Sequence, residues 1–200
     1  MSIYPLVMLI PASLVFLFLV WQNLQEDYKT SSVFTFGFYI LGFLYLGLLI
    51  AKVTNPLFWF WFAFAGSVSG FALGTRRADV KLLDGLEAST IALLFLLFFV
   101  ASAMFLKYYN PETFATMIFI LWLILLYYFV KTKYKSIGWY KSGKLGFCAL
   151  TVASIFFGFR IPVALFFPNM ISFLGKIDVI PSFFVSLFYV VSLLRLSRTK

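Results

Sequence analysis

Long apolar runs separated by short polar connections dominate this chain of 200 residues. A helix needs about 20 apolar residues to cross the roughly 30 Å core of a bilayer, because its backbone amides must be hydrogen-bonded internally. Runs without a charged residue occur at 3–21, 33–51, 57–74, 88–106, 113–130, 145–159 and 179–194. The pattern predicts one domain over residues 1–200, an all-α integral membrane bundle of about seven transmembrane helices.

One further apolar segment, residues 161–174, is too short to span and contains Pro162, Pro168 and Asn169. Non-helical backbone at membrane depth is tolerated only where protein or a water-filled cavity covers it. We therefore expect this segment to be re-entrant or to lie at the membrane interface.

Lysine and arginine fall mainly on one side of this predicted bundle. Twelve of the 16 lie in the first, third and fifth connections and the C-terminal tail; the others are Lys52, Lys107, Arg160 and Lys176. Because cytoplasmic loops collect positive charge, we expect the N-terminus outside and the C-terminus in the cytoplasm. The third connection also holds Asp79, Asp84 and Glu87. We expect them to form solvated ion pairs and to cap the fourth span; acid–base work by Asp84 and Glu87, which share a helical face, is the alternative.

Composition supports the membrane assignment and narrows the chemistry. Apolar residues make up 63% of the chain and charged residues 12%, whereas a soluble domain has about 25% charged residues. There is no histidine and one cysteine, so the usual general base, the commonest metal ligand and an internal disulfide are missing. We therefore expect no metal and no cofactor. We also expect no nucleic-acid partner, because the net charge of +9 reflects the membrane topology.

Three expected helix starts combine a side-chain acceptor with proline: Asn55-Pro56, Asn110-Pro111 and Asp178 followed by Pro181. The acceptor caps a free backbone amide, and proline in the first turn loses no hydrogen bond. All three fall on the expected outer side. Capping at the membrane surface is one interpretation, and binding of an anionic lipid headgroup by the helix ends is the other.

Gly66, Gly70 and Gly74 recur every fourth residue in the third expected span. Stacked glycines let a second backbone approach closely, as in GxxxG helix pairs. The stripe is a helix-packing surface whose partner is another span of the chain, a second copy in a homo-oligomer, or a lipid tail.

No charged residue lies in the middle of an expected span, which disfavours ion-coupled transport and proton pumping. Arg160, at the outer end of the sixth span, carries the most informative charge. A guanidinium can hold a phosphate through two parallel hydrogen bonds, although it can also snorkel to the interface. Lys107 and Asn110 lie on the same side, and our candidate contacts for a lipid headgroup are Arg160, Lys107 and Asn110.

Several segments, in order, resemble the bacterial prolipoprotein diacylglyceryl transferase family. The similar features follow one another along the chain. They are a glycine-rich third span with a basic exit (64–77), an Asp leading into the fourth span (81–88), an Asn-Pro helix start (110–114), a lysine-rich loop (131–146), a Phe-Arg span end (159–160) and a last helix with a basic tail (175–198).

This resemblance implies a multi-pass protein of the bacterial inner membrane that acts in lipoprotein biosynthesis. The family transfers a diacylglyceryl group from phosphatidylglycerol to the lipobox cysteine of a lipoprotein precursor. The partners implied are a membrane phospholipid and that precursor. The alternative is a non-catalytic membrane scaffold or assembly partner with a phospholipid-binding outer face.

The residues that carry the family's chemistry differ here. Ala65 stands where the family has a histidine, the stretch 98–101 replaces its Gly-Arg-x-Gly-Asn signature, Ala115 and Thr116 replace Tyr and Glu, and about Ala153 replaces an Arg. The catalytic residues are therefore unknown. Thioether formation needs a base, and without histidine that base would be Glu112, Asp178 or the lipid itself.

Overall fold

The computed structural model describes residues 4–55, 58–133, 145–166 and 175–198. Every regular element in these ranges is helical. The elements are α1 (Tyr4–Leu24), α2 (Thr30–Thr54), α3 (Trp59–Ala78), α4 (Leu82–Tyr108), α5 (Pro111–Lys133), α6 (Phe147–Phe166), the short 3₁₀ helix η3 (Gly175–Asp178) and α7 (Val179–Arg198).

Five of these helices, α2, α4, α5, α6 and α7, are long and apolar enough to cross a membrane. α1 adds a shorter apolar stretch, Met8–Leu24. The prediction of an all-helical, multi-pass membrane bundle is confirmed, and the count of about seven spans stays a prediction.

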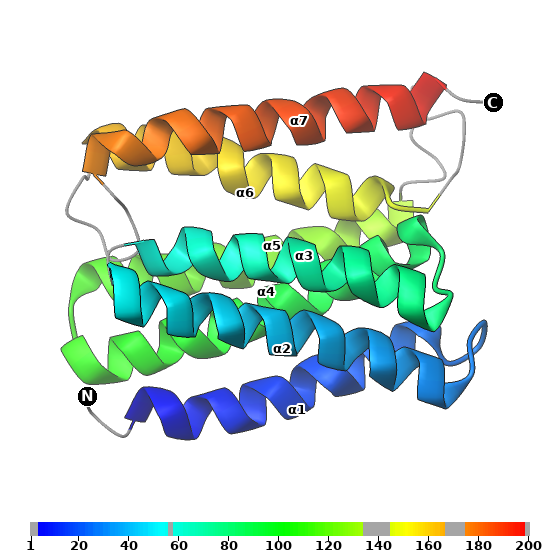
Figure 1. Ribbon diagram of the computed structural model, residues 1–200. Helices are drawn as coiled ribbons and strands as arrows, with labels where there is room; N and C mark the ends of the chain where they lie inside the picture. Colours follow the sequence, from blue (N-terminus) through cyan, green and yellow to red (C-terminus); the bar gives the residue numbers. More distant parts are fainter. Residues whose placement is uncertain (1–3, 56–57, 134–144, 167–174, 199–200) are drawn as a thin grey trace.

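The helices lie roughly side by side and alternate in direction (Figure 1). One end of the bundle holds the N-terminus, the α2–α3 and α4–α5 connections and the start of α7. We call it the N-terminal end. The opposite, C-terminal end holds the α1–α2 and α3–α4 connections and the end of α7.

α4 contributes to two hydrophobic clusters because its own apolar residues are distributed over all faces of the helix. Ala88, Ala92 and Leu96 of α4 pack in a cluster with α1 and α2. Ile91 and Leu94 pack in a second cluster with α5 and α6. α4 is therefore the central element against which both halves of the bundle are assembled.

The glycine stripe of α3 lies against α2 of the same chain. A Cβ atom added at Gly66 would be 2.2 Å from the Phe43 carbonyl oxygen, and one at Gly70 would be 2.5 Å from the Tyr39 carbonyl oxygen. At Gly74 the added atom would be 3.1 Å from the Phe36 ring. At Gly66 and Gly70 these distances leave no room for a side chain, so the two backbones are in direct contact there.

The predicted end of the sixth span is corrected. α6 continues through residues 161–166, so the interfacial or re-entrant prediction is wrong there; residues 167–174 lie outside the described residues. Pro162 is accommodated inside α6, as proline often is in membrane helices. Arg160 consequently lies inside α6, six residues before the helix ends, rather than at its last residue.

The three predicted caps also differ in outcome. Asn110 caps α5, since its Oδ1 accepts a hydrogen bond from the Thr113 amide at 2.9 Å. α3 instead begins after Phe58 with no side-chain cap. The Asp178 carboxylate accepts hydrogen bonds from side chains rather than from amides of α7.

Asp84 and Glu87 lie inside α4, and neither forms an ion pair with Arg76, Arg77 or Lys81. Asp84 accepts a hydrogen bond from the Tyr28 hydroxyl at 2.7 Å. The pKa of the Tyr28 hydroxyl is raised, first because the group is partly removed from water and second because it donates this hydrogen bond to Asp84. Glu87 is buried, and its Oε2 accepts hydrogen bonds from the amides of Gly146 at 3.1 Å and Ala149 at 3.4 Å. It thereby caps the start of α6.

The α2–α3 contact predicts a position-specific effect of adding one methyl group. Gly66→Ala places a Cβ against backbone and should lower the free energy of unfolding by about 2 kcal/mol. Gly42→Ala is the matched control, because no atom lies within 4 Å of its added Cβ. The control should be neutral or stabilising by up to about 1 kcal/mol.

Unfolding of the purified protein by increasing SDS measures both variants. Equal effects of Gly66→Ala and Gly42→Ala would contradict the close α2–α3 packing.

Candidate functional site

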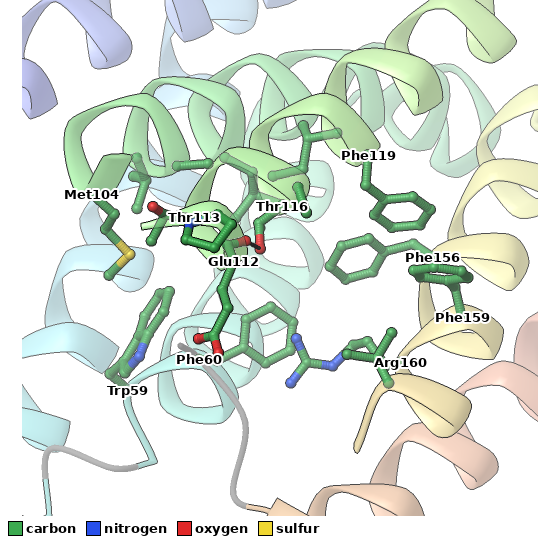
Figure 2. Close-up of a pocket in the computed structure, with 17 residues that line it drawn as sticks. Trp59, Phe60, Met104, Glu112, Thr113, Thr116, Phe119, Phe156, Phe159 and Arg160 are labelled. Atoms are coloured by element: carbon green, nitrogen blue, oxygen red, sulfur yellow. Dashed lines mark hydrogen bonds between the residues drawn. The ribbon is translucent and has the colours of Figure 1, made fainter. Parts of the chain in front are cut away.

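A cavity of about 420 Å³ lies between α3, α4, α5 and α6. Its volume is within the range of about 300–1,000 Å³ typical of small-molecule sites. Apolar and aromatic side chains form nearly all of its wall (Figure 2). Its lining residues are Trp59, Phe60, Leu97, Val100, Ala101, Met104, Pro111, Glu112, Thr113, Ala115, Thr116, Phe119, Ile120, Phe156, Phe159, Arg160 and Val163.

The polar side chains of this pocket gather toward the N-terminal end of the bundle. Glu112 and Thr113 lie in the first turn of α5, and Thr116 follows one turn later. Farther along α5 the lining residues are Phe119 and Ile120. The pocket therefore has a polar end and an apolar interior.

The tight α4–α5 connection places Glu112 at the pocket. Tyr109 ends α4 in the left-handed region (φ 47°), and its amide donates to the Phe105 carbonyl at 2.8 Å. The Asn110 cap then starts α5 at once. The first turn of α5 is thus held beside the last turns of α4.

A buried ion pair fixes Arg160, one of the residues of the pocket wall. Arg160 Nη2 lies 2.7 Å from Asp178 Oδ2, and the side chains are only 4% and 0% exposed. Arg160 Nε donates to the same oxygen at 3.1 Å. Removing two charges from water is costly unless they are paired and hydrogen-bonded, so this geometry holds α6 to the η3–α7 junction.

Two more donors complete the shell of the Asp178 carboxylate. Trp61 Nε1 donates to Oδ1 at 2.5 Å, and the Ser182 hydroxyl donates to Oδ2 at 3.3 Å. The group therefore joins α3, α6, η3 and α7. With both oxygens engaged, Asp178 is a structural acceptor rather than an available base.

Aromatic rings surround the Arg160 guanidinium. Its Cζ lies 3.8 Å from the centre of the Phe60 ring, which is a close cation–π contact. Trp61 and Phe156 are at 5.7 and 5.9 Å. The charge is thus enclosed by rings from α3 and α6 and by the Asp178 carboxylate.

The three headgroup candidates from the sequence lie in different environments. Arg160 lines the pocket but is buried and paired. Lys107 is exposed at the end of α4, and its Nζ donates to the Tyr108 hydroxyl at 2.7 Å. Asn110 uses its side chain to cap α5. Of the three, Arg160 alone is among the residues that line the pocket.

The sequence suggested Asp178 only as a helix start or as a possible base, and its contact with Arg160 was missed. A usable signal was present: an arginine between apolar residues needs a nearby acid, and Asp178 follows it by 18 positions on the same side of the bundle.

Glu112 is the other charged residue of the pocket wall. It is exposed, and no described residue forms a salt bridge or hydrogen bond with its carboxylate. Figure 2 shows its side chain extending from α5 toward Phe60. Among the residues described, no three His, Cys, Asp or Glu side chains gather as a metal-ligand group.

Comparison of the chain with protein-family models, curated proteins and solved structures finds no match.

The buried pair predicts non-additive effects of mutation. Arg160→Met and Asp178→Asn should each lower the free energy of unfolding by about 3 kcal/mol, because each leaves a buried charge unpaired. The double variant should lose less free energy of unfolding than the two single variants lose in sum. SDS unfolding of the four proteins gives the coupling energy, with exposed Arg77→Met as a control.

Additive losses, agreeing within about 0.5 kcal/mol, would contradict an energetically coupled pair.

Proposed function

We propose that this multi-pass membrane protein binds one membrane lipid in the pocket between α3, α4, α5 and α6. The pocket's polarity carries the proposal: its interior is apolar, and its polar side chains lie toward one end of the bundle. An acyl chain fits the part lined by Leu97, Ile120 and Phe156. The headgroup then lies near Glu112 and Arg160.

Lys107 is the proposed contact for the lipid phosphate. It lies one helical turn after Met104, a lining residue, and its exposed ammonium has three donors, of which one bonds to Tyr108. Asn110 contributes indirectly by holding the first turn of α5. Arg160 contributes a rigid wall through its contact with Phe60.

A second candidate function is diacylglyceryl transfer, which the sequence resemblance suggests. One observation favours it: of the two carboxylates considered as a base, Asp178 is occupied by three side chains, whereas Glu112 lines the pocket. Glu112 would take the proton of a precursor cysteine as sulfur bonds to the glyceryl carbon. The carbon–oxygen bond to the phosphate breaks, and the phosphorylated headgroup leaves. A non-catalytic lipid-binding scaffold is the alternative.

We also propose that the N-terminal end of the bundle faces outward, in the bacterial inner membrane, on the basis of the lysine and arginine distribution. In a Cys148→Ala background, a membrane-impermeant maleimide should label Lys107→Cys in intact cells. It should label Lys29→Cys only after the cells are opened. The reverse pattern would contradict this orientation.

Filling the pocket should prevent lipid binding. Ala115 is an exposed lining residue between Glu112 and Phe119 on α5, and Ala115→Trp adds an indole where the proposed headgroup and acyl-chain parts of the pocket meet. We expect bound phospholipid, measured by native mass spectrometry of detergent-purified protein, to fall at least tenfold. Ala72→Trp, at an exposed alanine of α3 outside the pocket, is the matched control and should retain lipid.

Equal lipid retention by Ala115→Trp and Ala72→Trp would contradict binding in the pocket. The transferase candidate is tested by incubating the protein with a lipobox peptide and phospholipid labelled in its diacylglyceryl part, carried on phosphatidylglycerol or phosphatidylethanolamine. Product above the Ala115→Trp level supports transfer. Lipid binding without product supports the scaffold alternative.

A further inference from the structure

The two charged side chains that line the pocket differ in pairing and exposure. Two lining residues are charged, Glu112 and Arg160. The Arg160 charge is matched by Asp178 at 2.7 Å, inside the protein. Glu112 has no such partner among the described residues. Among the described lining residues, Glu112 therefore carries the accessible charge that no ion pair neutralises.

The nearest basic residue in sequence does not cancel this charge. Lys107 does not line the pocket, and its ammonium lies 4.4 Å from the centre of the Tyr108 ring while donating to the Tyr108 hydroxyl. The first turn of α5 stabilises Glu112 through the helix dipole, which is equivalent to only about half a charge. The carboxylate therefore still attracts a cation.

The walls next to Glu112 suit a cation as well. Trp59 and Phe60 from α3 line the same end, and Phe119, Phe156 and Phe159 continue the aromatic lining (Figure 2). The faces of aromatic rings attract cations. Phe60 already contacts the Arg160 guanidinium at 3.8 Å, so Trp59, Phe119 and Phe159 are the lining rings that remain for a further cation.

We infer that the lipid held in this pocket carries an ammonium group in its headgroup, bound by the Glu112 carboxylate between aromatic walls. This inference rests on the proposed lipid-binding function and names the ligand class. A primary ammonium, as in phosphatidylethanolamine, donates charge-assisted hydrogen bonds to the carboxylate. The phosphate of the same headgroup extends toward Lys107. An anionic headgroup without an amine, as in phosphatidylglycerol, adds negative charge beside Glu112 and is disfavoured.

Competition between two lipids with identical acyl chains tests the inference. The purified protein in dodecyl maltoside receives equal amounts of phosphatidylethanolamine and phosphatidylglycerol, and native mass spectrometry measures the bound ratio. The wild type should favour phosphatidylethanolamine by about tenfold, as expected for one charge-assisted hydrogen bond. Glu112→Gln should reduce the ratio to within about twofold of unity. Glu112→Lys should reverse it.

Glu26→Gln is the control for charge, because Glu26 is an exposed glutamate in the α1–α2 connection at the opposite end of the bundle. It should leave the lipid ratio unchanged. A wild type that binds phosphatidylglycerol equally or better, or a ratio that Glu112→Gln does not change, would overturn the inference. Retention of both lipids by Ala115→Trp would instead overturn the proposed binding function.

Discussion

The ion pair between Arg160 and Asp178 is the interaction on which the N-terminal end of the bundle depends. In a nonpolar interior neither charge is tolerated alone, so the helices that carry them must meet. The pair joins α6 to η3 and the start of α7, and Trp61 brings in α3. Phe60 covers the guanidinium and at the same time lines the pocket. The position of the pocket wall thus follows from satisfying one buried carboxylate.

The same pairing decides the chemistry of the pocket. Because Asp178 neutralises Arg160 within the protein, the residue that first suggests an anion site contributes aromatic packing and rigidity instead. Glu112, in the first turn of α5, becomes the dominant accessible charge. A cluster of basic groups would suit a phosphate, whereas this pocket presents an accessible carboxylate. Our inference about the headgroup is based on this difference.

A buried carboxylate also organises the C-terminal end. Glu87 of α4 accepts two amide hydrogen bonds at the start of α6, and the Tyr127 hydroxyl of α5 donates to the Glu87 carbonyl oxygen at 3.3 Å. α6 is therefore held at both ends by acids from other elements. In the other half, α2 and α3 are joined without polar groups, through glycines that allow backbone contact. The two halves share α4, which is apolar on all sides.

The sequence by itself determined the helical membrane class, the approximate helices, the glycine contact surface and the Asn110 cap, because each depends on residues close together in the chain. It did not determine that α6 continues past Pro162, since the local signals of proline and a charge both indicate an end. Nor did it identify which partner the glycines contact, that Glu87 caps a helix about 60 residues away, or that Arg160 pairs with Asp178. Those features depend on which helices become neighbours, and tertiary packing alone decides this, because a buried charge is stabilised by whichever opposite charge the fold brings to it.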